Sequence, residues 1–212
     1  MIKISEAVLD LIQGDEVALE ALRAGVLNLS AYARKIKTQI EKRLYKSVRS
    51  GSIVTALSRI ATGIRDVQPL RPAVKINDLS IKARLFEVTY EKTQEIMDKV
   101  SLIEPKPGGN DFFTITQGLG EVTVIAPESN KEIILKHFGV KPKGQYDNLV
   151  AITVRFSELE YIEVPNMIYA LVAALASKRI NLIEIVSTFT EISFIVRQKD
   201  VDVAVDVLRN HF

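Results

Sequence analysis

The sequence predicts an α+β protein, in which a helical N-terminal domain precedes two copies of a unit built from strands and helices. Two observations predict this class. The spacing of apolar residues changes from a helical to an alternating pattern near residue 80. A six-residue segment also recurs 70 residues further along the chain. Disulfides and thiolate metal sites are excluded, because the 212 residues contain no cysteine.

The N-terminal part, residues 1–65, is expected to form a basic helical domain. Its apolar residues recur at the spacing of amphipathic helices, and short polar residues mark where these helices begin. Asp15 is expected to start the second helix, Ser30 to cap the third, and Ser50 or Ser52 to cap the fourth.

A duplicated unit follows a predicted linker at residues 66–78, where two prolines oppose helix formation. We place the copies at residues 79–140 and 149–212, because Glu121–Ala126 matches Glu191–Val196 at an offset of 70. Each copy has the order strand, helix, strand, strand, helix, which is typical of a ferredoxin-like sandwich. One such unit leaves a sheet face and edges uncovered, so we expect the two to pair and a homodimer to form through them.

Charge is strongly segregated along the chain, although the net charge is only +2. Between Val26 and Lys75 there are eleven basic and two acidic residues, a net charge of +9, whereas residues 76–212 carry a net charge of −4. This split indicates that the two parts of the chain have different partners.

The segment from Val164 to Phe212 resembles the ACT domain family, and most closely the regulatory tail of aspartokinases. The resemblance lies in Pro165-Asn166 before an apolar helix, in Ile180-Asn181-Leu182 before the next strand, and in the strand that begins at Glu191. It implies two ACT units, the first of which matches only through the internal repeat. It does not extend to the kinase itself, which needs a further domain about as large as this whole chain.

In the ACT family, small ligands, often amino acids, bind where the loop and helix start of one unit meet a second unit. A helix N-terminus suits a carboxylate, because its N–H groups are unpaired and its end of the helix dipole is positive. The ligand-binding residues that the resemblance implies are Val164, Pro165, Asn166, Met167, Asn181 and Leu182.

This loop departs from the family pattern at two points. Asn166 stands where the family usually has glycine, although asparagine can cap a helix and tolerates unusual backbone angles. The preceding loop, Ser157–Val164, contains Glu158, Glu160 and Glu163, which would repel a ligand's carboxylate but could hold its ammonium group. The alternative is an ACT unit that binds no ligand and only mediates oligomerisation.

The basic helical domain resembles a winged-helix or helix-turn-helix core at Leu29–Ile36 and at Ser50–Ile60. A stretch this basic supplies the phosphate-neutralising charge that dominates affinity for nucleic acid. Docking on an acidic protein, or dimerisation, is the alternative for the same surface. The candidate nucleic-acid-binding residues, most of which fall in these two segments, are Lys35, Lys37, Arg49, Ser52, Thr55 and Arg59.

No chemistry of an enzyme is expected. The only histidines, His137 and His211, end the repeated helices, where we expect them to cap helix C-termini, and no residue pattern suggests a catalytic residue, cofactor or metal. No apolar run reaches the ~18 residues of a membrane span, so we expect a cytoplasmic protein without a membrane partner.

The expected function is regulation in response to a small molecule, as a transcriptional regulator in amino-acid metabolism that binds DNA. The alternative is a non-enzymatic interaction module that oligomerises or docks on a protein partner such as a metabolic enzyme. Charge segregation and the repeat motivate the first hypothesis, and the basic helical surface is compatible with both.

Overall fold

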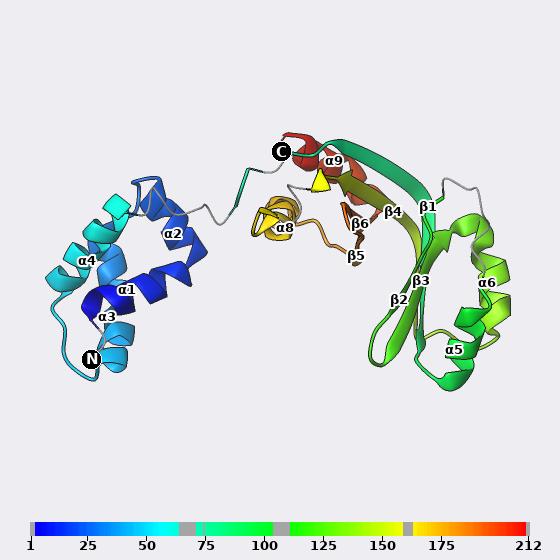
Figure 1. Cartoon of the computed structure of the whole chain (residues 1–212), viewed down its shortest axis with the longest axis horizontal. Coiled ribbons are helices and arrows are strands. Elements are labelled where there is room, and N and C mark those ends of the chain that lie inside the picture. The colour runs from blue at the N-terminus through cyan, green and yellow to red at the C-terminus, as the bar shows by residue number, and fades with distance from the viewer. Residues whose placement is uncertain (1–2, 64–70, 74, 104–110, 159–162, 211–212) are drawn as a thin grey trace. The chain divides into compact units, whose positions relative to one another are not determined.

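The chain divides into a helical unit, Met1–Pro72, and a tandem unit, Ala73–Phe212 (Figure 1). Within the predicted linker, residues 66–70 and 74 lie outside the described residues. No described helix combines the length and apolar character that a membrane crossing requires. The computed structural model describes residues 3–63, 71–73, 75–103, 111–158 and 163–210.

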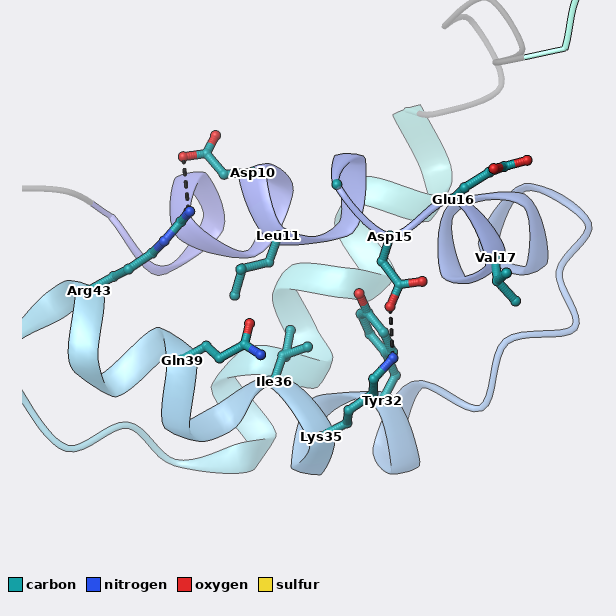
Figure 2. Close-up of a pocket in the computed structure, with 11 residues that line it drawn as sticks. Asp10, Leu11, Asp15, Glu16, Val17, Tyr32, Lys35, Ile36, Gln39 and Arg43 are labelled. Atoms are coloured by element: carbon teal, nitrogen blue, oxygen red, sulfur yellow. Dashed lines mark hydrogen bonds and ion pairs between the residues drawn. The ribbon is translucent and has the colours of Figure 1, made fainter. Parts of the chain in front are cut away.

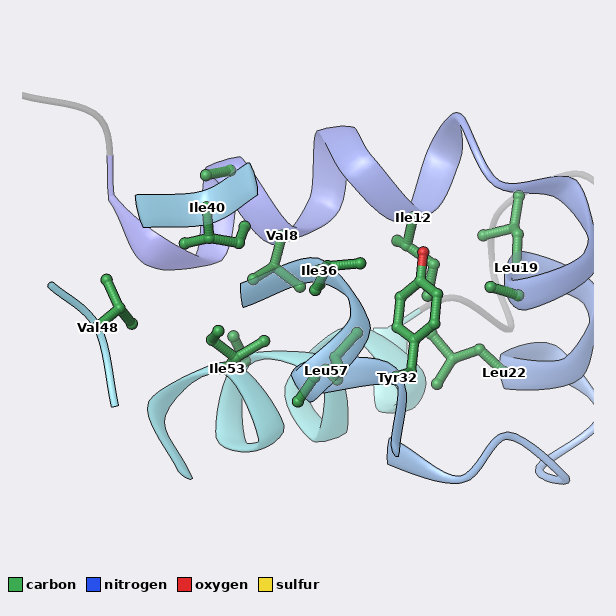
Figure 3. Close-up of a cluster of buried hydrophobic side chains, with 14 residues drawn as sticks. Val8, Ile12, Leu19, Leu22, Tyr32, Ile36, Ile40, Val48, Ile53 and Leu57 are labelled. Carbon is green, nitrogen blue, oxygen red and sulfur yellow. The ribbon is translucent and has the colours of Figure 1, made fainter. Parts of the chain in front are cut away.

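The described residues of the helical unit form helices around one apolar core and include no β-strand. Figure 3 shows this core, in which the side chains of Ile12, Ile40, Ile53 and Leu57 are completely buried. The absence of a strand among these residues means that no wing accompanies the helices there. The helices are α1 (Ile4–Gln13), α2 (Glu16–Arg23), α3 (Leu29–Leu44) and α4 (Ser50–Gly63).

Short polar side chains set the starts of these helices. Asp15 accepts a hydrogen bond from the backbone N–H of Ala18 at 3.1 Å and caps α2, so this prediction is confirmed. The prediction that Ser30 caps α3 is wrong, because Asn28 accepts from the backbone N–H of Ala31 and the helix already begins at Leu29. Both candidates have a short polar side chain, and the earlier one makes the capping bond.

The tandem unit is built on one six-stranded antiparallel sheet in the order β2-β3-β1-β4-β6-β5. The predicted order of strand, helix, strand, strand, helix occurs twice, and short 3₁₀ turns precede the last helix of each copy. The elements are β1 (Asp78–Glu91), α5 (Gln94–Ser101), β2 (Thr114–Gln117), β3 (Glu121–Pro127), α6 (Lys131–Phe138), β4 (Gly144–Arg155), α8 (Met167–Ser177), β5 (Glu184–Ser187), β6 (Glu191–Arg197) and α9 (Val201–Asn210).

The long central strands β1 and β4 each serve both copies. The first part of β1, Asp78–Lys82, pairs with Ala151–Arg155 of β4, beside the second copy. The later part of β1, Leu85–Glu91, pairs with β3 of the first copy and with the beginning of β4. Each half of the sheet therefore has four strands, of which the fourth belongs to the other copy, and each half has the strand order of a ferredoxin-like sandwich.

A matched pair of bulges joins the two halves. The register between β1 and β4 shifts on either side of Leu85, which lies opposite Leu149. Arg84 and Asn148, the residues just before this pair, both have a left-handed backbone, with φ of 61° and 55°. The extra residue in β1 reverses its alternation, so that Leu79 before the bulge packs on the second core and Phe86 and Val88 after it lie in the first.

Each half has an apolar core between the sheet and its own two helices, and a third cluster lies on the helix-free face. Residues of β1, β3, α5 and α6 form the first core, and residues of β4, β6, α8 and α9 form the second. The third cluster centres on Leu85, Leu149, Ile125 and Ile195, all at most 1% exposed. The sheet bends along β1 and β4 (Figure 1), and this curl encloses the helix-free face.

Candidate functional site

The loop that leads into α8 ends in a left-handed turn. Asn166 occupies the N-cap position with φ 64° and ψ 19°. Glycine adopts this backbone freely and asparagine tolerates it, so Asn166 fits the place where the resemblance expects glycine. The expected cap is not formed, because the Asn166 side chain makes no hydrogen bond to the first turn of α8. A left-handed N-cap turns its side chain away from these N–H groups, since side-chain capping normally needs extended backbone.

The predicted ligand-binding residues fall into two groups. Val164 is half-buried, Pro165 and Asn166 are exposed, and Met167 anchors the helix start in the second core at 4% exposure. The remaining two, Asn181 and Leu182, follow the other end of α8. An 11-residue helix is roughly 16 Å long, so the structure brings the first four residues together but separates them from the last two.

The carboxylates of this loop are on the surface. Glu158 and Glu163 are both exposed, and Glu160 lies outside the described residues. Glu163 is three residues before the left-handed Asn166, near enough in the chain to meet a ligand at the helix start. Among the residues that the structure describes, no group of three or more His, Asp or Glu side chains could hold a metal ion.

The equivalent helix of the first copy begins differently. Thr93 has extended backbone and its hydroxyl accepts a hydrogen bond from the backbone N–H of Ile96 at 3.3 Å, which caps α5. The first turn of α5 thus has an acceptor from its own cap, whereas the first turn of α8 has none from Asn166. Of these two helix starts, only that of α5 has a side-chain hydrogen bond from its own N-cap residue.

Figure 2 shows a cavity of about 480 Å³ in the helical unit, between the α1–α2 turn and α3. Lys35 Nζ donates to Asp15 Oδ2 at 2.8 Å, and this hydrogen bond lowers the pKa of Asp15. Arg43 reaches Asp10 at 3.4 Å in the same way. Burial, together with the charge of Asp15, raises the pKa of Tyr32 to about 12. The cations of this cavity are therefore already neutralised.

The predicted nucleic-acid-binding residues do not form one patch. Lys35 lies in the cavity of Figure 2, and Lys37 makes an i,i+4 ion pair with Glu41 at 3.7 Å. Three others are exposed on α4, and the sixth is exposed just before this helix. These four residues are Ser52, Thr55, Arg59 and, before the helix, Arg49.

A buried carboxyl group on the helix-free face of the sheet escaped the sequence analysis. Glu87 in β1 is only 5% exposed, and its Oε2 atom has no hydrogen-bond partner. Burial, followed by the nearby charge of Glu184, raises the pKa of Glu87 to about 7. Burial likewise raises the pKa of Glu184. The alternation of β1, which places Glu87 on the same face as Leu85, was the signal that could have located it.

His137 of α6 contacts the end of a neighbouring helix, α5. Its Nε2 atom lies 2.8 Å from the carbonyl oxygen of Lys99, in the last turn of α5. His137 thus meets a helix C-terminus as expected, but that of α5, whereas Gly139 ends α6 in a left-handed conformation. The second predicted cap, His211, lies outside the described residues.

Residues 146–210 match the model of the ACT domain family, which confirms the resemblance for the second copy of the unit. The comparison with curated proteins finds no match. Among solved structures, the aspartate kinase of Clostridium acetobutylicum has a TM-score of 0.53 at 15% identity, over 65% of this chain and 35% of that one. The chain thus spans about a third of that kinase.

Two regulatory subunits of aspartate kinase are matched over nearly their whole length. The ligand-free subunit from Thermus thermophilus has a TM-score of 0.53 at 14% identity, over 66% of this chain and 99% of that one. The subunit from Thermus flavus has a TM-score of 0.52 at 10% identity, over 65% of this chain and 98% of that one. These matches confirm the predicted fold class, a helical part followed by ACT-like ferredoxin folds.

Proposed function

We propose that this chain, with its ACT domain at residues 146–210, is a non-enzymatic regulatory protein that binds an amino acid at the start of α8. The observation that carries the proposal is the left-handed, uncapped turn at Asn166. N–H groups in the first turn of a helix, together with the positive end of its dipole, attract a carboxylate. The likeness to regulatory subunits of aspartate kinase supports a regulatory role over a catalytic one.

The surroundings of this turn favour an amino acid over a simple carboxylate. Glu163 is exposed beside the turn and provides a negative charge for an ammonium group. Val164 is half-buried on the second core, and Met167 is anchored within it, so the helix start has an apolar flank for the ligand's side chain. Opposite charges on the two ends of the site would orient a zwitterion, with its carboxylate toward α8.

Regulation requires that the ligand bind one state of the protein more tightly than another. We propose a homodimer formed through the ACT units as the assembly in which these states differ. A ligand at the start of α8 would then change how the two chains of the dimer pair and, through that pairing, the position of their helical units. A ligand with equal affinity for both pairings would not shift the equilibrium between them and would not regulate the protein.

A thermal-shift panel of the twenty amino acids at millimolar concentration tests the binding proposal. A ligand at 100 times its dissociation constant adds about 2.7 kcal/mol to stability, which raises the melting temperature by several degrees. The variant Asn166→Asp places a carboxylate at the helix start, where it should abolish this rise. The control Asn130→Asp makes the same change before α6 and should keep it. The absence of a rise with any amino acid would reject the proposal.

A second candidate function, regulation of transcription through DNA binding, rests on the helical unit. The observation that favours it is the basic face beside α4, where Arg49 and Arg59 are exposed. Fluorescence anisotropy with duplex DNA at several salt concentrations tests it, since binding through phosphates weakens steeply with salt. Capture of one stoichiometric protein partner, without salt-dependent DNA binding, would favour the rival function of docking on an enzyme.

A further inference from the structure

A second cavity of the helical unit, of about 390 Å³, lies where α1, α4 and the loop between α3 and α4 meet. Lys3 and Ser5 come from the start of α1, and Lys46 comes from the loop. Ser52, Thr55 and Arg59 line the cavity from α4, at positions i, i+3 and i+7. This spacing places the three side chains on one exposed stripe of the helix.

Among the described residues, no acidic side chain pairs with the cations of this cavity. Lys3, Lys46 and Arg59 converge from three segments, and no carboxylate lines the cavity beside them. Within the described residues, none of the three forms an ion pair. The neighbouring Glu6 is turned toward the backbone N–H of Lys3, with which it caps α1 at 3.0 Å.

The cavity of Figure 2 differs from this one in the pairing of its cations. That cavity also contains two cations, Lys35 and Arg43, but Asp15 and Asp10 bind them. Because both cations are paired with carboxylates of the protein, this cavity has little attraction for an external anion. In the second cavity the like charges repel one another, and an anion that binds between them removes this repulsion.

The polar groups of the second cavity suit the oxygens of a phosphate. The hydroxyl of Ser5, on α1, and that of Ser52, on α4, have no partner among the described residues and can donate hydrogen bonds. Thr55 Oγ1 donates to the carbonyl oxygen of Gly51 at 3.0 Å, which fixes its position on the stripe. Arg59 can bind two phosphate oxygens at once, and the two lysines act as point charges.

We propose that the cavity between α1 and α4 is a phosphate-binding site, in which Lys3, Lys46 and Arg59 neutralise the charge of one phosphate group and the serine hydroxyls hydrogen-bond its oxygens. The phosphate can belong to the backbone of a nucleic acid or to a phosphorylated small molecule. The nucleic-acid source rests on the second candidate function, to which the cavity adds a defined point of contact. Neither source depends on the amino-acid site at α8.

The test compares two double variants of the full chain that remove the same charge. The variant Lys46→Gln with Arg59→Gln removes two of the three cationic side chains of the proposed site. The control, Arg34→Gln with Lys42→Gln, removes two exposed cations of α3 that line neither cavity. All four residues are exposed, so both variants should keep their helical content, which circular dichroism verifies. The probes are inorganic phosphate, titrated by calorimetry, and a duplex DNA, titrated by anisotropy.

The proposal predicts that the cavity variant binds its probe at least about tenfold more weakly and that the control loses less than about threefold. Specific loss for duplex DNA alone assigns the phosphate to a nucleic-acid backbone, and specific loss for inorganic phosphate alone assigns it to a small molecule. Equal weakening in both variants would mean diffuse attraction and overturn the proposal, as would the failure of wild-type protein to bind either probe. A response to amino acids in the thermal-shift panel is unaffected in each case.

Discussion

The two copies within the tandem unit have the same internal frame. In the first copy, the hydroxyls of Thr89 and Thr123 share a hydrogen bond of 2.9 Å across β1 and β3. At the equivalent positions of the second copy, Thr153 and Ser193 share one of 2.7 Å across β4 and β6. The same registers, the same bulges and the same helix-covered face recur in both copies. Duplication has therefore kept the elements that hold each half together.

The copies differ in two polar features, a buried carboxyl group and the cap at the start of the first helix. Glu87 of β1 lies opposite Ile125, and its counterpart on β4, opposite Ile195, is Ala151. The start of α5 is capped by Thr93, whereas the start of α8 is left uncapped by Asn166. The two copies thus share a frame but differ in the side-chain cap at the start of their first helix.

The largest effect should come from removing a large side chain in one of the two cores. Phe138 is completely buried in α6 and contacts Tyr90, with ring centroids 4.2 Å apart. Phe138→Ala should lower the free energy of unfolding by about 3–5 kcal/mol, and Leu208→Ala in α9 by about 2–5 kcal/mol. Because β1 and β4 serve both halves, each variant should shift one common transition in urea unfolding. A variant with two separate transitions would show that the halves unfold independently.

Glu87 should make the stability of the tandem unit depend on pH, because its pKa is raised to about 7 by burial. A carboxyl group with a raised pKa binds its proton more tightly in the folded state, so stability falls as the pH rises from the unfolded value toward the folded one. The loss approaches about 3 kcal/mol above pH 7. Glu87→Gln should remove it, so that the variant exceeds wild type in stability at pH 8 but not at pH 4.

Urea unfolding of wild type and of Glu87→Gln at several pH values measures how much Glu87 contributes to the pH dependence of stability. The control is Glu132→Gln, which removes an exposed carboxyl group from α6. A wild-type pH profile in the Glu87 variant would contradict the assignment. Equal flattening in the control would also contradict it, because the effect would then reflect overall charge.

The smallest effects concern the two helix starts. Thr93→Ala removes the cap of α5 and should cost about 1 kcal/mol of stability. Asn166→Gly should change stability by less than about 0.5 kcal/mol, since there is no side-chain cap to lose and glycine adopts this backbone without strain. Thermal unfolding compares the two variants. If glycine at this position cost as much as the loss of the Thr93 cap, Asn166 would have to stabilise α8 in another way.

The elements of the tandem unit could be predicted because their signals are local. The repeat located β3 and β6, since Glu121–Ala126 and Glu191–Val196 each lie within one strand, and every residue after the first glutamate is buried. Gly118 closes the hairpin between β2 and β3 by donating its N–H to the carbonyl oxygen of Glu121. Alternation and turn chemistry act within a few residues, so the sequence alone reveals them.

Features that depend on distant residues could not be predicted in this way. Lys35 was a nucleic-acid candidate by its charge, but the fold places it against Asp15, 20 residues away in the chain. The sharing of β1 and β4 between the copies also depends on pairing partners that no local pattern specifies. In the candidate ligand site, the left-handed backbone at Asn166 was anticipated from the resemblance, but the absence of its side-chain cap was not.

Hydrogen exchange with and without an amino acid that gives a thermal shift tests the central claim most directly, because it compares the two helix starts in one molecule. We expect the ligand to slow exchange in the first turn of α8, from Met167 onward, and to leave exchange in the first turn of α5, after Thr93, unchanged. Slowed exchange at the start of α5 alone, or at neither helix start although the amino acid binds, would show that the ligand does not bind at the start of α8.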